Sequence, residues 1–262
     1  MEHVNLLNRI SKPSAHTPIG RLLPANLDPI KFGIVDYSQL LDDLGLEMAW
    51  KVILDNISNL TIAELKGSFF DFDNLGEIYE IGLAYTNKIT KKELGKYYTP
   101  DDVSSLMFEL LLENTNLINL VDVGCGTGNL IISVIKTAMK SGQTDIIRRI
   151  REGRVWLYDV DPVALSICVV KIEILLQEKV GSLIHVVLGD FLDKKIELPS
   201  DCTVITNPPY SIIKEIKKNW IRSDVLLQSK DLYAGFIDRI LQQERCKEVF
   251  QRESTCVDQP HL

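Results

Sequence analysis

The chain has 262 residues, of which 45% are hydrophobic and 25% charged, a composition typical of a globular protein with a sizeable core. A net charge of −7 excludes a protein that coats nucleic acid with its whole surface. No apolar run reaches the about 18 residues that span a bilayer, and the N-terminus lacks a signal-peptide layout, so we expect a cytoplasmic location and no membrane partner.

The N-terminal third predicts helices. Residues 1–30 carry four prolines and little periodicity, which indicates an extended arm. From Tyr37 to about Lys92, apolar residues recur at three- and four-residue spacing, which predicts a small helical module. The segment GKYYTP then interrupts this pattern, so we assign residues 1–94 to an N-terminal arm and helical module.

The remainder of the chain alternates short apolar strands with helices. Strands are expected at 117–124, 154–160, 182–190 and 201–210. This alternation predicts right-handed βαβ units, and hence an α/β fold with a Rossmann-like, doubly wound parallel sheet that follows the helical module. We assign residues 95–245 to this catalytic domain and 246–262 to a polar tail without a strand.

The first expected strand leads into DVGCGTGNL, with glycines at Gly124, Gly126 and Gly128. Glycine lets the backbone turn tightly and approach a ligand closely. The G-x-G-x-G spacing differs from the dinucleotide fingerprint, and by itself it is a weak signal for a nucleotide-like ligand.

Acidic residues follow the next two strands. Asp159 suits a pair of ribose hydroxyls, because a carboxylate accepts two hydrogen bonds, whereas Asp161 precedes a proline and is better explained as a helix cap. Asp190 suits an adenine amino group, and Phe191 offers a ring face for stacking. A turn aspartate and a core phenylalanine are the plainer alternatives for the last two.

The fourth strand ends in TNPPYS. Two consecutive prolines make a rigid turn, with Asn207 on one side and Tyr210 on the other. A basic cluster follows at Lys214, Lys217, Lys218 and Arg222, and a solvated surface and a nucleic-acid contact are equally favoured for it. The arginines at 148, 149, 151 and 154 favour a solvated helix face. The five cysteines and four histidines show no metal-binding spacing, so no metal is expected.

The segments DVGCGTG, YDVDP, GDF and NPPY resemble the motif series of class I S-adenosylmethionine-dependent methyltransferases that methylate exocyclic amines. GKYYTP ahead of the glycine loop is similar to the amino-terminal motif of adenine-N6 DNA methyltransferases of restriction–modification systems. The resemblance covers roughly residues 75–240. It implies S-adenosylmethionine as the cofactor and an adenine in DNA as the target.

The resemblance also implies roles for individual residues. Tyr98, Thr99 and Pro100 would line the methionine end of the cofactor, and Val160 and Phe191 would sandwich its adenine. The full set implied to bind the cofactor is Tyr98, Thr99, Pro100, Asp122, Gly124, Gly126, Gly128, Asp159, Val160, Asp190, Phe191 and Asn207.

The catalytic residues implied are Asn207, Pro208, Pro209 and Tyr210. The Asn207 side-chain oxygen and the Pro208 carbonyl would accept the two N–H bonds of the target amine, the prolines would hold both acceptors in place, and Tyr210 would stack on an extruded base. Asp231 and Tyr233 are expected to face the same pocket, and Phe236 to lie in the core.

The chain departs from the family pattern at its C-terminal end. The polar tail predicts a sheet without its last strands, and the region that usually grips DNA is not recognisable, so a second polypeptide that supplies both is one expectation. Two alternatives stay open: methylation of a glutamine side chain or an RNA base, and a catalytically incomplete subunit that binds the cofactor.

Overall fold

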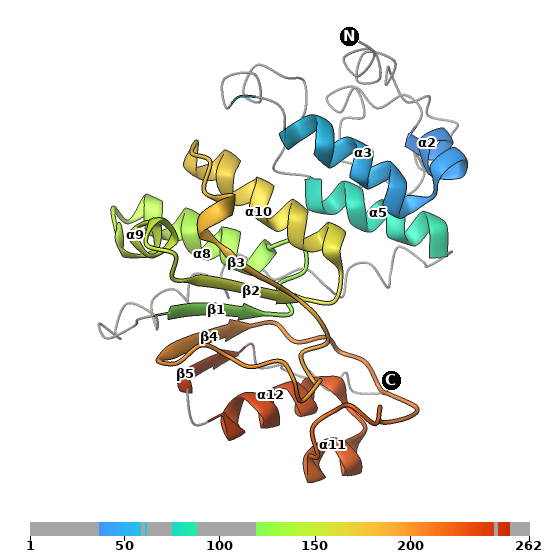
Figure 1. Ribbon diagram of the computed structural model, residues 1–262, viewed down its shortest axis with the longest axis vertical. Helices are drawn as coiled ribbons and strands as arrows, with labels where there is room; N and C mark the ends of the chain where they lie inside the picture. The colour runs from blue at the N-terminus through green and yellow to red at the C-terminus, as the bar shows by residue number, and fades with distance from the viewer. Residues whose placement is uncertain (1–36, 59–60, 62–74, 88–118, 244–245, 252–262) are drawn as a thin grey trace, which may run out of the picture.

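The structure, a computed structural model, describes residues 37–58, 61, 75–87, 119–243 and 246–251. A five-stranded, fully parallel sheet in the order β3-β2-β1-β4-β5 forms its centre (Figure 1). The strands are β1 (Asn119–Val123), β2 (Val155–Asp159), β3 (His185–Leu188), β4 (Cys202–Thr206) and β5 (Cys246–Gln251). The order reverses direction at β1, and this confirms the predicted doubly wound α/β architecture.

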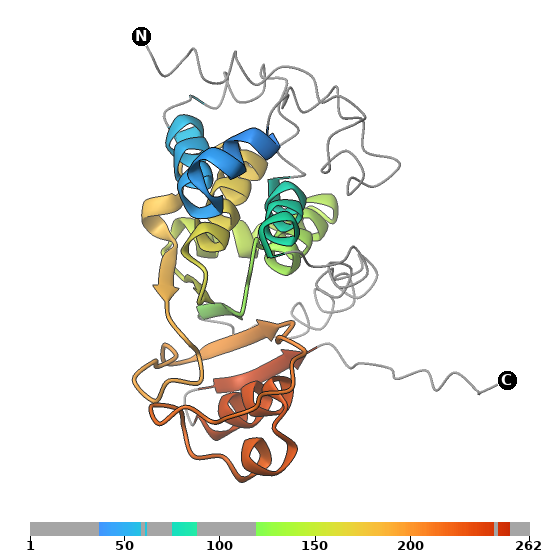
Figure 2. The ribbon, with the colours of Figure 1, turned by 90° about the vertical axis from the view of Figure 1, so that its right-hand side faces the viewer.

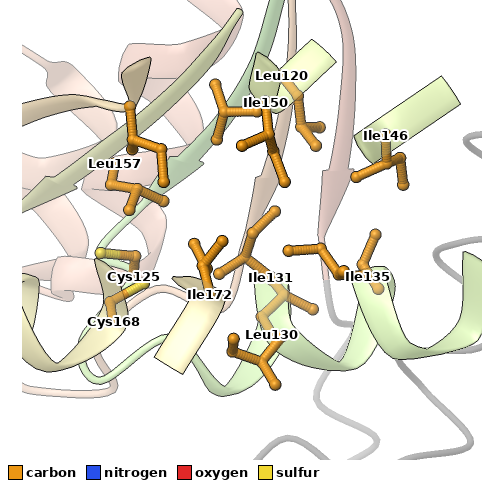
Figure 3. Close-up of a cluster of buried hydrophobic side chains, with 14 of the residues drawn as sticks. Leu120, Cys125, Leu130, Ile131, Ile135, Ile146, Ile150, Leu157, Cys168 and Ile172 are labelled. Atoms are coloured by element: carbon orange, nitrogen blue, oxygen red, sulfur yellow. The ribbon is translucent and has the colours of Figure 1, made fainter. Parts of the chain in front are cut away.

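One face of the sheet is covered by helices α8 (Asn129–Lys140), α9 (Asp145–Arg151) and α10 (Pro162–Leu176). Alternate strand residues point to this face, and Figure 3 shows Leu120 and Leu157 gathered with side chains of these helices. Every second strand residue and the apolar side of α8 therefore pack together in one continuous core.

The other face packs against α11 (Asp224–Ser229) and α12 (Leu232–Gln242), as the two views together show (Figures 1 and 2). Val121 and Val204, the strand residues that alternate with the first face, contact this layer. A short 3₁₀ turn at η5 (Gly181–Leu183) leads into β3. Because both faces of β1 and β4 are covered, apolar residues of these strands are buried on both sides of the sheet.

In the described part of the N-terminal third, an outer layer is formed by α2 (Tyr37–Leu44), α3 (Leu46–Ser58) and α5 (Leu75–Asn87). They confirm the helices expected before residue 92. Trp50 of α3 meets Tyr79 of α5 edge-on, with ring centroids 5.3 Å apart, and both pack with Ile167 of α10 in one buried cluster. Helix α10 is therefore buried on two sides, between this layer and the sheet.

The expectation that residues after 245 contribute no strand is wrong. β5 pairs with β4 in parallel, with an irregularity in register between Cys202 and Thr203. The backbone pairing with β4 runs from Cys246 to Gln251. The sheet thus continues through Gln251, beyond the expected domain boundary.

Several expectations fall outside the described residues: the arm at 1–30, the GKYYTP segment and the tail beyond 251. Among the helices that the structure describes, none has the length and apolar character needed to cross a membrane.

Candidate functional site

A cavity of about 410 Å³ lies beside the carboxyl ends of the strands, where a doubly wound sheet places its ligands. It brings together residues from four predicted motifs that are far apart in the chain. Those of the predicted site that line it are Asp122, Gly124, Gly126, Asp159, Val160, Asp190, Phe191, Asn207, Pro208, Pro209 and Tyr210.

Gly124 holds the glycine loop close to the proline corner. Its φ of +72° is unfavourable for other residues, and its N–H donates to the Tyr158 carbonyl at 2.8 Å. A Cβ placed on Gly124 would lie 3.6 Å from Phe236 Cε1 and 3.9 Å from Pro209 Cδ. The loop and the corner therefore lie next to each other and line the same cavity.

Gly128 has a role in helix packing. It does not line the cavity but serves as the N-cap of α8, with a φ of +85°. A Cβ there would lie 2.5 Å from Cys168 Sγ of α10. Gly128 therefore allows the close packing of two helices, and its predicted contact with the cofactor stays a prediction.

Asp159 ties the second strand to the glycine loop. One carboxylate oxygen accepts from the Gly126 N–H at 2.8 Å and the other from the Asp161 N–H at 2.9 Å. Burial raises the pKa of Asp159. The predicted helix cap is confirmed, since the Asp161 carboxylate accepts from Val163 and Ala164 at the start of α10.

Asp122 is a buried carboxyl in the cavity wall. It is 1% exposed, and the backbone N–H of Ile131 is the hydrogen-bond donor that acts on it. Burial, together with the nearby charge of Asp159, raises the pKa of Asp122 to about 8. A buried carboxyl is costly in a core, and this one lies where a ligand in the cavity would meet it.

The Asn207 corner is anchored and pre-ordered. The Thr206 hydroxyl donates to the Val123 carbonyl at 2.7 Å, which fixes the end of β4 to that of β1. The Tyr210 hydroxyl donates to Asn207 Oδ1 at 3.0 Å, and the Tyr210 ring stacks on Tyr233 with centroids 5.4 Å apart. The amide and the aromatic ring of the corner therefore belong to one small network.

The third strand end combines expected and unexpected features. Asp190 accepts hydrogen bonds from Lys217 Nζ at 2.7 Å and from Trp220 Nε1 at 2.8 Å. Phe191 lines the cavity but is 2% exposed, because its ring packs against Phe236 and beneath the Arg239 guanidinium. The Phe191 ring is therefore already packed against other side chains where adenine stacking is predicted. Val160, which follows the neighbouring strand β2, is 64% exposed.

Sequence reasoning missed several polar residues of the cavity, among them Thr127 and Asn129 at the glycine loop. Lys217 and Trp220 come from the loop after the proline corner, and Glu80 comes from α5. Burial raises the pKa of Glu80 to about 7. The basic cluster was a signal for Lys217, but no local pattern distinguishes Glu80 from the other acids of an amphipathic helix.

Other predicted positions lie elsewhere. Asp231 does not line the cavity and instead caps α12, where it accepts from the Tyr233 N–H at 3.0 Å. Phe236 is buried in the core, as expected, and also lines the cavity. Arg148 pairs with Asp145 on the surface, in keeping with a solvated helix face, but Arg149 is only 6% exposed, so the expectation is wrong for that residue.

Tyr98, Thr99 and Pro100 lie outside the described residues, so their predicted role stays a prediction. No group of three potential metal ligands occurs in the part of the chain that the structure describes.

Comparisons with known proteins agree with this geometry. The type II methyltransferase M.VspI of Vibrio sp. (strain 343) is 30% identical over 168 residues, which cover 63% of this chain and 37% of that protein. The methylase subunit of the type I restriction enzyme MpnII of Mycoplasma pneumoniae is 28% identical over 91 residues, or 34% of this chain and 16% of the subunit. This chain therefore matches little more than a third of the first relative's length and a smaller part of the second.

Among solved structures, the DrdV–DNA complex aligns with a TM-score of 0.43 at 18% identity, over 81% of this chain and 24% of DrdV. Residues 71–243 match the family described as N-6 DNA Methylase. This match spans both the helix that carries Glu80 and the proline corner, and the chain belongs to the N-6 DNA methylase family.

Proposed function

We propose that this protein transfers a methyl group from S-adenosylmethionine to the exocyclic N6 amine of an adenine in DNA. The observation that carries the proposal is the approach of two motifs across one cavity. The glycine loop and the Asn207–Tyr210 corner line the same space, and a Cβ placed on Gly124 would lie 3.9 Å from Pro209 Cδ. Family membership supports adenine in DNA over a glutamine side chain or an RNA base.

The cavity fits an adenosyl cofactor. Its volume of about 410 Å³ is typical of sites for small ligands. Asp159 at the end of β2 is placed to accept ribose hydroxyls, and the glycine loop offers backbone close to the ligand. The bound cofactor supplies an electrophilic methyl group on a sulfonium.

The proline corner explains how a poor nucleophile becomes reactive. The lone pair of an adenine amine is delocalised into the ring, and two acceptors for its N–H bonds draw the nitrogen toward tetrahedral geometry. Asn207 Oδ1 and the Pro208 carbonyl are the two acceptors. Oδ1 has two lone pairs, so its bond from the Tyr210 hydroxyl is compatible with accepting one more hydrogen.

The aromatic pair at the corner suits an extruded base. Tyr210 and Tyr233 are nearly parallel, with an interplanar angle of 13°. A base that leaves the DNA stack regains stacking energy on such a surface, about 1–3 kcal/mol for each base. We assign Tyr210 to this contact, with Tyr233 as its support.

The test is transfer of a labelled methyl group from the cofactor to adenine-containing duplex DNA, with RNA and protein acceptors in parallel. Label in N6-methyladenine is the expected result, and label found only in protein or RNA would refute the DNA assignment. Cofactor binding without transfer, restored by a second polypeptide, would instead identify this chain as one part of a divided enzyme.

A further inference from the structure

Helix α5 of the outer layer reaches into the cavity at Glu80. Two residues close to Glu80 in the sequence, Tyr79 and Gly76, fix the position of α5. The Tyr79 hydroxyl donates to Asp161 Oδ2 at 2.5 Å, and a Cβ placed on Gly76 would lie 2.5 Å from Thr127 Oγ1 of the glycine loop. Close packing of α5 on the glycine loop at Thr127, and on the segment after β2 at Asp161, therefore holds Glu80 beside the glycine loop.

The Glu80 carboxylate has no hydrogen bond or ion pair with any residue that the structure describes. The nearest cation, Lys171 of α10, donates instead to the Thr127 carbonyl and to Asn129 Oδ1, each at 3.0 Å. Glu77, on the same helix, adds a like charge. A half-buried carboxylate in these surroundings gains much from a cationic ligand that enters the cavity.

Three other acids line the cavity, and of these Asp122 is only 1% exposed. Asp159 and Asp190 already accept hydrogen bonds from their neighbours and mark the strand ends where the nucleoside half of the cofactor would lie. The sulfonium methyl must face Asn207. The remaining amino-acid end then extends along the glycine loop toward α5, where its α-ammonium needs acceptors.

We propose that the Glu80 carboxylate binds the α-ammonium of the methionine end of S-adenosylmethionine, an inference that rests on the proposed function. The outer helical layer is then part of the cofactor site, and α5 couples cofactor binding to the packing of this layer on α10. The methyl-transfer chemistry itself stays with the proline corner.

Binding measurements with three ligands test the proposal. Glu80→Gln is expected to weaken S-adenosylmethionine and S-adenosylhomocysteine equally, by about 10- to 100-fold, because both carry the ammonium. Binding of 5′-methylthioadenosine, which lacks the amino-acid end, is expected to stay unchanged. Glu47→Gln, on the exposed side of α3, makes the same charge change away from the cavity and should alter none of the three.

Three results would overturn the inference. Unchanged affinity in Glu80→Gln would remove the contact, a loss confined to S-adenosylmethionine would place the carboxylate at the sulfonium, and an equal loss for 5′-methylthioadenosine would make Glu80 merely structural. Failure of the unmodified protein to bind any of the ligands would instead refute the proposed cofactor.

Proton release gives a second readout. In the free protein Glu80 is partly protonated at pH 7, because burial outweighs the opposing effect of Lys171 on its pKa. Binding of a cation would ionise it, so titration calorimetry in buffers of different ionisation enthalpy should detect protons released. The Glu80→Gln variant should release fewer protons on binding. The Asp122→Asn variant should still release the protons that come from Glu80. Equal release from Glu80→Gln and the unmodified protein would contradict the proposal.

Discussion

At the scale of single residues, the proposed methyl transfer depends on one amide oxygen, Asn207 Oδ1, which accepts a hydrogen bond from the target amine. Asn207→Ala removes that acceptor but leaves the prolines and the glycine loop in place. We expect methyl transfer to fall by about 100-fold or more, with cofactor affinity within a few fold, by analogy with the loss of one transition-state hydrogen bond.

The matched control for this change is Asn219→Ala. Asn219 is exposed and donates to Asp193 outside the cavity, so transfer should be unaffected. Initial rates and equilibrium binding separate the two effects. Equal losses of turnover and cofactor affinity in Asn207→Ala would make the residue structural.

Asp122 makes stability depend on pH. Its pKa is about 8 in the folded protein, against 3.8 for an ordinary aspartate, so the native state keeps a proton that the unfolded chain loses. Its favourable contribution is complete below about pH 4 and is lost as pH rises to about 8, at up to about 1.4 kcal/mol for each pH unit. Asp122→Asn should abolish this loss.

The measurement is the free energy of unfolding from urea titrations at intervals between pH 5 and pH 8. Glu80 contributes in the same direction but only up to about pH 7, and Glu80→Gln therefore serves as the comparison. Parallel pH profiles for Asp122→Asn and the unmodified protein would show that the buried carboxyl is ionised in the native state.

At the scale of elements, the glycine loop is also a packing device. Gly128 and Gly142 both have positive φ, +85° and +71°, but only at Gly128 would a Cβ collide with another element. Each change to Ala incurs the left-handed backbone cost of about 1–2 kcal/mol, and overpacking against Cys168 adds about 1–3 kcal/mol to Gly128→Ala alone.

Urea denaturation of the two variants measures this difference. Replacing Cys168 by Ala in the Gly128→Ala background should recover part of the loss, because it removes the Sγ atom at 2.5 Å. Equal destabilisation of Gly128→Ala and Gly142→Ala would mean that α8 and α10 can separate without cost.

The same scale shows which elements local sequence specifies. The strands around β1, β2 and β4 were predictable because buried parallel strands are short apolar runs bounded by glycine, acid or proline. β5 was not, because CKEVFQ has no clear alternation, and its strand state depends on the edge that β4 offers. The cap at Asp161 was predictable since Asp-Pro encodes it locally.

At the scale of the whole molecule, the outer helices and the sheet domain share α10. Trp50 is 1% exposed in the cluster that joins them, and Trp50→Ala should destabilise the protein by about 3–5 kcal/mol. Trp156 and Trp220 then remain as fluorescent probes of the sheet domain. Their unfolding transition should move to lower urea concentration, because the two layers unfold together.

An unshifted fluorescence transition in Trp50→Ala, with an early loss of helical circular dichroism, would contradict this coupling. It would mean that the outer layer unfolds by itself and that α5 can leave the cavity without disturbing the sheet.

The sequence by itself determined the chemistry that the molecule can carry: the glycine spacing, the acid after β2, the rigid Asn-Pro-Pro-Tyr turn and the alternation that makes a parallel sheet. Each of these depends on neighbouring residues, whose backbone preferences and periods act over a few positions. Only the tertiary structure decided that Glu80 joins the cavity, that Gly128 packs on Cys168 and that the Tyr210 hydroxyl meets Asn207 Oδ1. Burial and close packing of the whole chain decide which distant segments come together and which side-chain rotamers are adopted at the corner. A local sequence pattern does not contain this information.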